Sequence, residues 1–153
     1  HLYNFGVFQK SYAIGLSQNP IGHKVRRGDN RLPEGLYRIK QKAKGPFPGR
    51  WGPYLGFRWM RLSYPNKVDA DIGLQRGIID SKQHRSIIRA VEKGVQPPKT
   101  TPLGGGIGIH GWKGRWIDNG SQNLTWGCIT VNNDDLEKLY DEIPMDTPIL
   151  IVP

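Results

Sequence analysis

His110 and Cys128 are the residues of this sequence whose types and spacing favour covalent chemistry. Cys128 is the single cysteine, so it can form neither an internal disulfide nor a multi-cysteine zinc site. The nucleophile in cysteine chemistry is the thiolate, and a histidine within hydrogen-bonding reach can take up the thiol proton. The 17 residues that separate His110 from Cys128 are enough for the two side chains to meet. On residue types alone, a buried packing cysteine and a structural histidine are the commoner outcome.

Other motifs do not indicate a cofactor or a metal. Residues 106–111 match the dinucleotide-binding pattern G-x-G-x-x-G, but that pattern opens a helix, and residues 112–116 cannot form one. The four histidines have no partner at metal-ligand spacing. We therefore expect no cofactor and no metal site.

The elements that position His110 and Cys128 are expected to be mostly strands. Strands are predicted within residues 2–14, 36–40, 51–62, 107–110 and 147–152, from alternating, aromatic or β-branched residues between turn signals. Helical spacing predicts a helix over 81–92, and a second over 134–143 that Asn133 caps and that carries acids in its first turn. We expect one mainly β domain over residues 1–153, with one or two short helices.

The charge of the sequence is strongly asymmetric. The 153 residues include 22 Lys and Arg against 13 Asp and Glu, a net charge of +9, with +15 on residues 1–117 and −6 on residues 118–153. A basic body favours an anionic partner such as nucleic acid, an acidic membrane surface or a carboxylate-rich cell wall. No apolar run approaches the roughly 20 residues that cross a bilayer. The sequence begins at His1 without an export signal, so we expect such a signal or a further domain upstream.

The neighbours of His110 and Cys128 resemble the L,D-transpeptidase catalytic domain, the YkuD-like family. The family pattern is an I-H-G strand, then [S/T]-x-G-C-[I/V], a nearby N-x-D and a final T-P strand. Four segments carry it in that order: residues 107–111 (IGIHG), 125–129 (TWGCI), 133–136 (NDDL) and 147–149 (TPI). Residues 28–37 resemble its G-D-x-x-T-P-E-G-x-Y segment. Departures at Leu32, Trp126, Thr130 and Asp146 are closer to the YafK-like branch, in which hydrolytic members occur.

The resemblance implies a YkuD-like β-sandwich of mixed sheets and a site built around a nucleophile. Cys128 is expected to attack an L-to-D peptide bond of a peptidoglycan stem peptide, with His110 as base, either as a preformed ion pair or during attack. The backbone carbonyl of Gly111 is expected to orient His110. The backbone N–H groups of Trp126, Gly127 and Cys128 are expected to bind the oxyanion.

The surrounding residues have weaker expectations. Four are candidates for contacting the stem peptide, namely Thr125, Trp112, Lys113 and Arg115, although the aromatic rings can equally fill the core and the basic side chains can equally be solvated. The resemblance implies no cofactor, and it implies an extracytoplasmic place in the bacterial cell envelope, with peptidoglycan rather than nucleic acid as the partner.

Three functions remain open at this level. The first is transpeptidation, in which an amine takes the acyl group from Cys128, and the second is hydrolysis, in which water takes it. The third is a non-catalytic basic domain that binds an anionic polymer, which the pairs Arg50–Trp51, Arg58–Trp59 and Arg115–Trp116 would suit. The third reading predicts salt-sensitive binding that is indifferent to Cys128.

Overall fold

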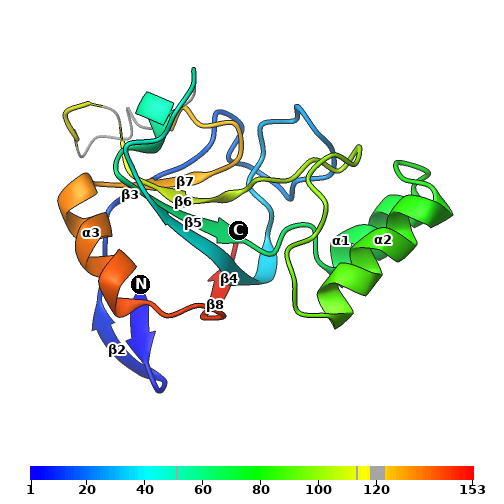
Figure 1. The fold of residues 1–153 in the computed structure, drawn as a ribbon, viewed down its shortest axis with the longest axis horizontal. Coiled ribbons are helices and arrows are strands. Elements are labelled where there is room, and N and C mark those ends of the chain that lie inside the picture. The colour runs from blue at the N-terminus through cyan, green and yellow to red at the C-terminus, as the bar shows by residue number, and fades with distance from the viewer. Residues whose placement is uncertain (51, 113, 118–122) are drawn as a thin grey trace.

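The computed structural model describes residues 1–50, 52–112, 114–117 and 123–153. Their strands are β1 (Leu2–Asn4), β2 (Val7–Lys10), β3 (Ile14–Gly15), β4 (Gly35–Lys44), β5 (Arg58–Leu62), β6 (Gly108–His110), β7 (Ile129–Val131) and β8 (Pro148–Ile151). Their helices are α1 (Lys67–Gln75), α2 (Ser81–Glu92), α3 (Asn133–Glu142) and the short 3-10 helix η1 (Gly52–Leu55). The predicted mainly β fold is confirmed, and Figure 1 shows its strands with helices at both ends.

Six of these strands form one mixed sheet in the order β3-β7-β6-β5-β4-β8, and β1 and β2 form a separate hairpin. Neighbouring strands are antiparallel except for β6 and β7, which run parallel. A parallel pair needs a long crossover between its strands, and residues 111–128 provide it. The candidate base therefore lies on β6, and the candidate nucleophile immediately precedes the adjacent strand β7.

The main core lies between the sheet and α3. Alternate residues of β4 and β5 point into it, among them Tyr37, Ile39, Met60 and Leu62, all at most 1% exposed. Helix α3 packs against β5. The apolar stripe that helical spacing predicts is buried, with Leu136, Leu139 and Tyr140 in the helix and Ile143 at its C-cap. The predicted cap is wrong by one residue, because Asn132 is the N-cap of α3 and accepts from the Asp134 N–H at 3.1 Å.

Helices α1 and α2 pack together at the other end of the molecule, on a second, smaller core (Figure 1). The sequence reasoning predicted α2 but not α1. Both helices begin with a capping box, Asn66 with Asp69 and Asp80 with Gln83. The first of these boxes is the sequence signal that could have predicted α1. None of the helices among the described residues is both long and apolar enough to span a membrane.

Candidate active site

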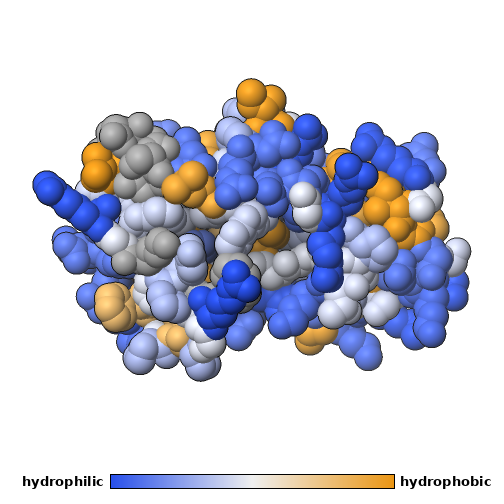
Figure 2. Space-filling view, turned by 90° about the horizontal axis from the view of Figure 1, so that it is seen from above, coloured by the Kyte–Doolittle hydropathy of each residue, from blue (hydrophilic) through white to orange (hydrophobic). Residues whose placement is uncertain are grey.

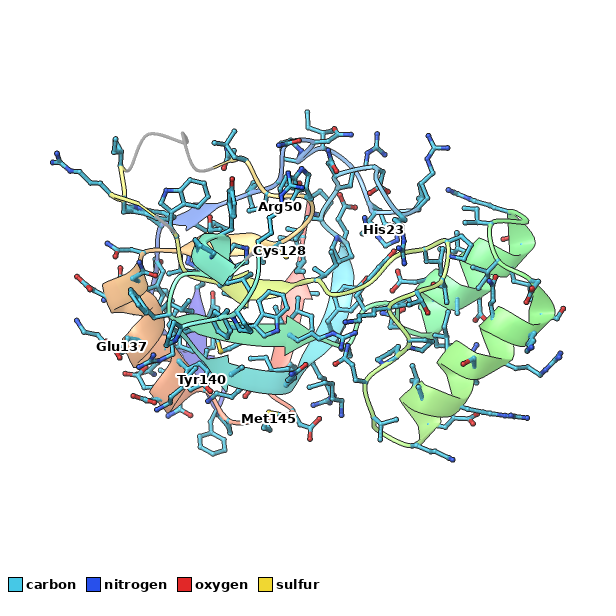
Figure 3. The ribbon with its side chains drawn as sticks, turned by 45° about the horizontal axis from the view of Figure 1, so that its top comes forward. His23, Arg50, Cys128, Glu137, Tyr140 and Met145 are labelled. Carbon is cyan, nitrogen blue, oxygen red and sulfur yellow. The ribbon has the colours of Figure 1, made fainter. Side chains whose placement is uncertain are left out.

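The register of β6 and β7 determines how His110 and Cys128 are related. Ile109 lies opposite Ile129, and His110 lies opposite Thr130. Cys128 immediately precedes β7, so it lies level with Gly108, two positions before the partner of His110. Because side chains alternate along a strand, this offset of two places both residues toward one face of the sheet. Figure 3 shows Cys128 at the sheet, away from Glu137 on α3.

His110 is buried, with 4% of its surface exposed, and its ring is held by the next residue. Its Nδ1 lies 2.7 Å from the carbonyl oxygen of Gly111. A carbonyl can only accept, so Nδ1 carries the proton, and in the neutral imidazole Nε2 is the basic nitrogen. Burial lowers the pKa of His110 to about 4, against the opposing effect of the Gly111 and Tyr54 carbonyls. The imidazole is therefore neutral at pH 7.

Cys128 is partly exposed, and its sulfur contacts the glycine-rich approach to β6. The thiol donates to the carbonyl oxygen of Gly106, with Sγ 3.8 Å away. Burial raises the pKa of the thiol to about 11, although the Gly108 amide and the charge of Lys24 act in the opposite direction. A thiol with this pKa is protonated at pH 7, so the resting site holds a neutral thiol and a neutral imidazole.

The turn before Cys128 is organised by the hydroxyl of Thr125. Thr125 Oγ1 accepts from the N–H of Cys128 at 3.1 Å and from the N–H of Gly127 at 3.4 Å, and it donates to the Cys128 carbonyl at 2.6 Å. Two of the three N–H groups expected to bind an oxyanion thus bind Thr125 in this structure. Thr125 was expected near the substrate, and the structure places it beneath the nucleophile's own backbone.

Gly127 is required for a close approach that the sequence does not reveal. Its φ of +123° is in the region that favours glycine, and an added Cβ would lie 2.7 Å from the carbonyl oxygen of Arg31. The loop that contains Arg31 therefore packs directly against the residue before the nucleophile. The space that a side chain would need at Gly127 is therefore taken by the backbone of Arg31.

Asn133 fixes the chain on the other side of the site, just after His110. Its Oδ1 accepts from the Trp112 N–H at 3.2 Å, and its Nδ2 donates to the Trp112 carbonyl at 2.8 Å. A Cβ on Gly111 would lie 2.0 Å from the same Oδ1, and one on Gly56 would lie 2.4 Å from it. The side chain thus clamps the peptide segment whose carbonyl orients His110. Sequence reasoning assigned Asn133 to helix capping and missed this contact.

The remaining predicted residues differ in their relation to the site. Trp112 is half-buried beside Gly111, Trp126 is 50% exposed, and the centres of the Trp126 and Tyr54 rings are 6.1 Å apart. Arg115 is exposed, and among the described residues it takes no part in the hydrogen bonds that organise the site. Lys113 lies outside the described residues. Trp59, which the sequence suggested only as part of a polymer-binding pair with Arg58, packs on His110 with ring centres 5.9 Å apart.

Comparison with known proteins gives the family. Residues 5–151 match the family model of the YkuD L,D-transpeptidase catalytic domain. The chain belongs to this family. Curated protein sequences give no match.

Solved structures similar to this YkuD domain come from longer proteins. One is the helical cell shape determining protein Pgp2 from Campylobacter jejuni, 26% identical with a TM-score of 0.53 over 93% of this chain and 37% of that chain. The K307A mutant of that protein is 26% identical, with a TM-score of 0.54 over 93% of this chain and 36% of that chain. Bd1075 from Bdellovibrio bacteriovorus is 25% identical, with a TM-score of 0.49 over 85% of this chain and 36% of that chain. The YkuD domain described here spans little more than a third of these chains.

Proposed function

We propose that this YkuD domain is a cysteine-dependent acyl-transfer enzyme that acts on L-to-D peptide bonds of peptidoglycan stem peptides, outside the cytoplasm. The observation that carries the proposal is the arrangement of His110. Its Nδ1 is bound to Gly111, which leaves Nε2 as the basic atom, and it lies on the strand adjacent to the one that follows Cys128.

The first chemical step would begin from neutral partners. The pKa of the thiol is far above that of the imidazole, so a resting ion pair is disfavoured. As the sulfur of Cys128 attacks the carbonyl carbon, its proton passes to Nε2 of His110. The thiol must first turn from the Gly106 carbonyl toward the imidazole. Catalytic hydrogen bonds commonly tighten only when substrate is bound.

The oxyanion of the tetrahedral intermediate needs donors, and the turn before Cys128 would supply them. The N–H groups of Gly127 and Cys128 would exchange the Thr125 hydroxyl for the oxyanion, with the Trp126 N–H beside them. A preorganised donor contributes about 3 kcal/mol to transition-state stability, and the loss of the bond to Thr125 offsets part of that gain here. The imidazolium of His110 then returns its proton to the leaving amine, the C–N bond breaks, and a thioester remains on Cys128.

The fate of the thioester distinguishes transpeptidation from hydrolysis. Attack by an amine gives a cross-linked or exchanged peptide, and attack by water gives a shortened free peptide. Both routes use His110 to take the proton of the incoming nucleophile.

Defined tetrapeptide and pentapeptide muropeptides, incubated with the protein and analysed by mass spectrometry, test the proposal. Cross-linked dimers or exchanged D-amino acids indicate transfer, and free shortened peptides indicate hydrolysis. The Cys128→Ala variant should form neither product and retain the fold. Unchanged turnover by this variant would refute Cys128 as the nucleophile. Salt-sensitive binding to the polymer, with no product from either protein, would replace the proposal with the binding-domain alternative.

A further inference from the structure

The loop of residues 23–31 beside Gly127 is built around one buried carboxylate. Asp29 accepts from the N–H groups of Val25 at 2.8 Å, Arg26 at 2.9 Å and Arg31 at 3.1 Å, and from Nζ of Lys24 at 2.6 Å. Burial opposes ionisation, but Lys24 and the three amides outweigh it and hold the pKa of Asp29 below its usual value. The negative charge of Asp29 is therefore compensated within the loop, chiefly by its ion pair with Lys24.

The arginines of this loop are left with unequal environments. Arg27 donates from Nη2 to the carbonyl of Lys99 at 2.8 Å. The guanidinium groups of Arg26 and Arg31 have no hydrogen-bonding or ion-pair partner in the part of the chain that the structure describes. Arg31 is only half-exposed, and its Nη1 lies over Gly22, where an added Cβ would be 3.3 Å away. The guanidinium of Arg31 is thus held beside Gly22, that of Arg26 is exposed, and neither has an anionic partner among the described residues.

Arg26 and Arg31 line the same groove, whose volume is about 490 Å³. Asn19, Val25, Asp29 and Ile78 complete its wall. A space of this size accommodates a small peptide group. Asp29 is the acidic member of the lining, and it is already paired with Lys24. The free charge that the groove offers a ligand is therefore positive.

One residue of the groove wall, Arg31, contacts the turn that carries the nucleophile. The carbonyl of Arg31 packs against Gly127, and the Gln18 N–H donates to the Thr125 carbonyl at 2.9 Å. The charge of Lys24 acts on the Cys128 thiol. Figure 1 shows the loop, in blue, above the sheet between its upper edge and helices α1 and α2, and Figure 2 shows that hydrophilic side chains dominate the face seen from above.

We propose that Arg26 and Arg31 form a subsite for a free carboxylate of the acyl-donor peptide. The inference rests on the proposed function, because it assigns this groove to the donor that Cys128 attacks. Guanidinium groups bind carboxylates in pairs of parallel hydrogen bonds, and a stem peptide with a free carboxylate offers such a partner. The expected consequence is selectivity for donors that retain the carboxylate. The sequence pointed to Lys113 and Arg115 for this role.

Binding can be measured without catalysis, with the intact Cys128→Ala protein and two tetrapeptide muropeptides that differ only in carboxylate or carboxamide. Isothermal titration should show tighter binding of the carboxylate form by about 10- to 100-fold, the range expected for charged hydrogen bonds. Adding Arg26→Gln and Arg31→Gln together should remove this preference. Adding Arg27→Gln, the same change of charge in the same loop, should leave it intact.

The outcomes separate the two proposals. If the protein with Cys128 forms a thioester but the Cys128→Ala protein binds both donors equally, the subsite is refuted and the proposed function stands. If no thioester forms but binding depends on the carboxylate and on Arg26 and Arg31, the proposed function fails and the subsite stands. Equal loss of affinity for both donors in the double variant also refutes carboxylate recognition, and thermal melting checks that each variant is folded.

Discussion

The replacement Asn133→Ala tests whether the segment after His110 positions the catalytic base. The variant loses two hydrogen bonds to the Trp112 backbone, at 3.2 and 2.8 Å. Each bond contributes about 1 kcal/mol, and an abandoned partly buried group costs about 1–3 kcal/mol, so the free energy of unfolding should fall by about 2–4 kcal/mol. The freed segment includes the Gly111 carbonyl that orients His110. Because a displacement of about 1 Å costs on the order of 100-fold in rate, kcat should fall that far while KM changes little.

The neighbouring residue provides a matched control for this prediction. Asn132→Ala removes the N-cap of α3, which should cost about 1 kcal/mol of stability and leave kcat unchanged. Stability is measured by urea unfolding, and kcat and KM by mass-spectrometric product formation from a tetrapeptide muropeptide. The reasoning is refuted if Asn133→Ala keeps the original kcat although it is destabilised. It is equally refuted if Asn132→Ala loses the same activity, because helix stability alone would then account for the loss.

Three further predictions follow from His110, Cys128 and Gly127. In the unfolded chain His110 binds a proton below about pH 6.5, and in the folded chain only near pH 4. Lowering the pH from 7 to 5 should therefore reduce the free energy of unfolding by about 2 kcal/mol through His110, and the His110→Asn variant should not show this loss. Iodoacetamide should alkylate Cys128 slowly at pH 7 and faster as the pH rises toward about 11; rapid alkylation at pH 7 would mean a resting thiolate. Gly127→Ala should lower the free energy of unfolding by about 2 kcal/mol or more, because of the positive φ of Gly127 and its contact with Arg31. A Cβ at Gly114 would have no neighbouring atom closer than 3.9 Å, so Gly114→Ala should leave the urea midpoint unchanged.

The order of the motifs and the periodicity of the sequence predicted the family, the β class and the positions of α2 and α3. These features are local, so a linear sequence contains them. The identity of the α3 cap was wrong because two adjacent asparagines satisfy the same rule, and only the fold shows that Asn133 is engaged by Trp112. Helix α1 was missed although its capping box is visible in the sequence.

The features of the site that could not be predicted depend on tertiary contacts. The neutral state of His110 and Cys128 follows from burial, which motif spacing does not contain. The packing of Gly127 on Arg31 joins segments about 100 residues apart, so the basic groove beside the nucleophile has no local signature. The same reasoning left transfer and hydrolysis open, because both proceed through one thioester.

The central claim is that Cys128 forms that thioester, and intact-protein mass spectrometry during incubation with a tetrapeptide muropeptide tests it most directly. The account predicts an adduct whose mass is that of the donor less its terminal D-amino acid, mapped to Cys128 and absent from Cys128→Ala. The account is contradicted if the donor is converted with no adduct at any time, or if Cys128→Ala carries the same adduct.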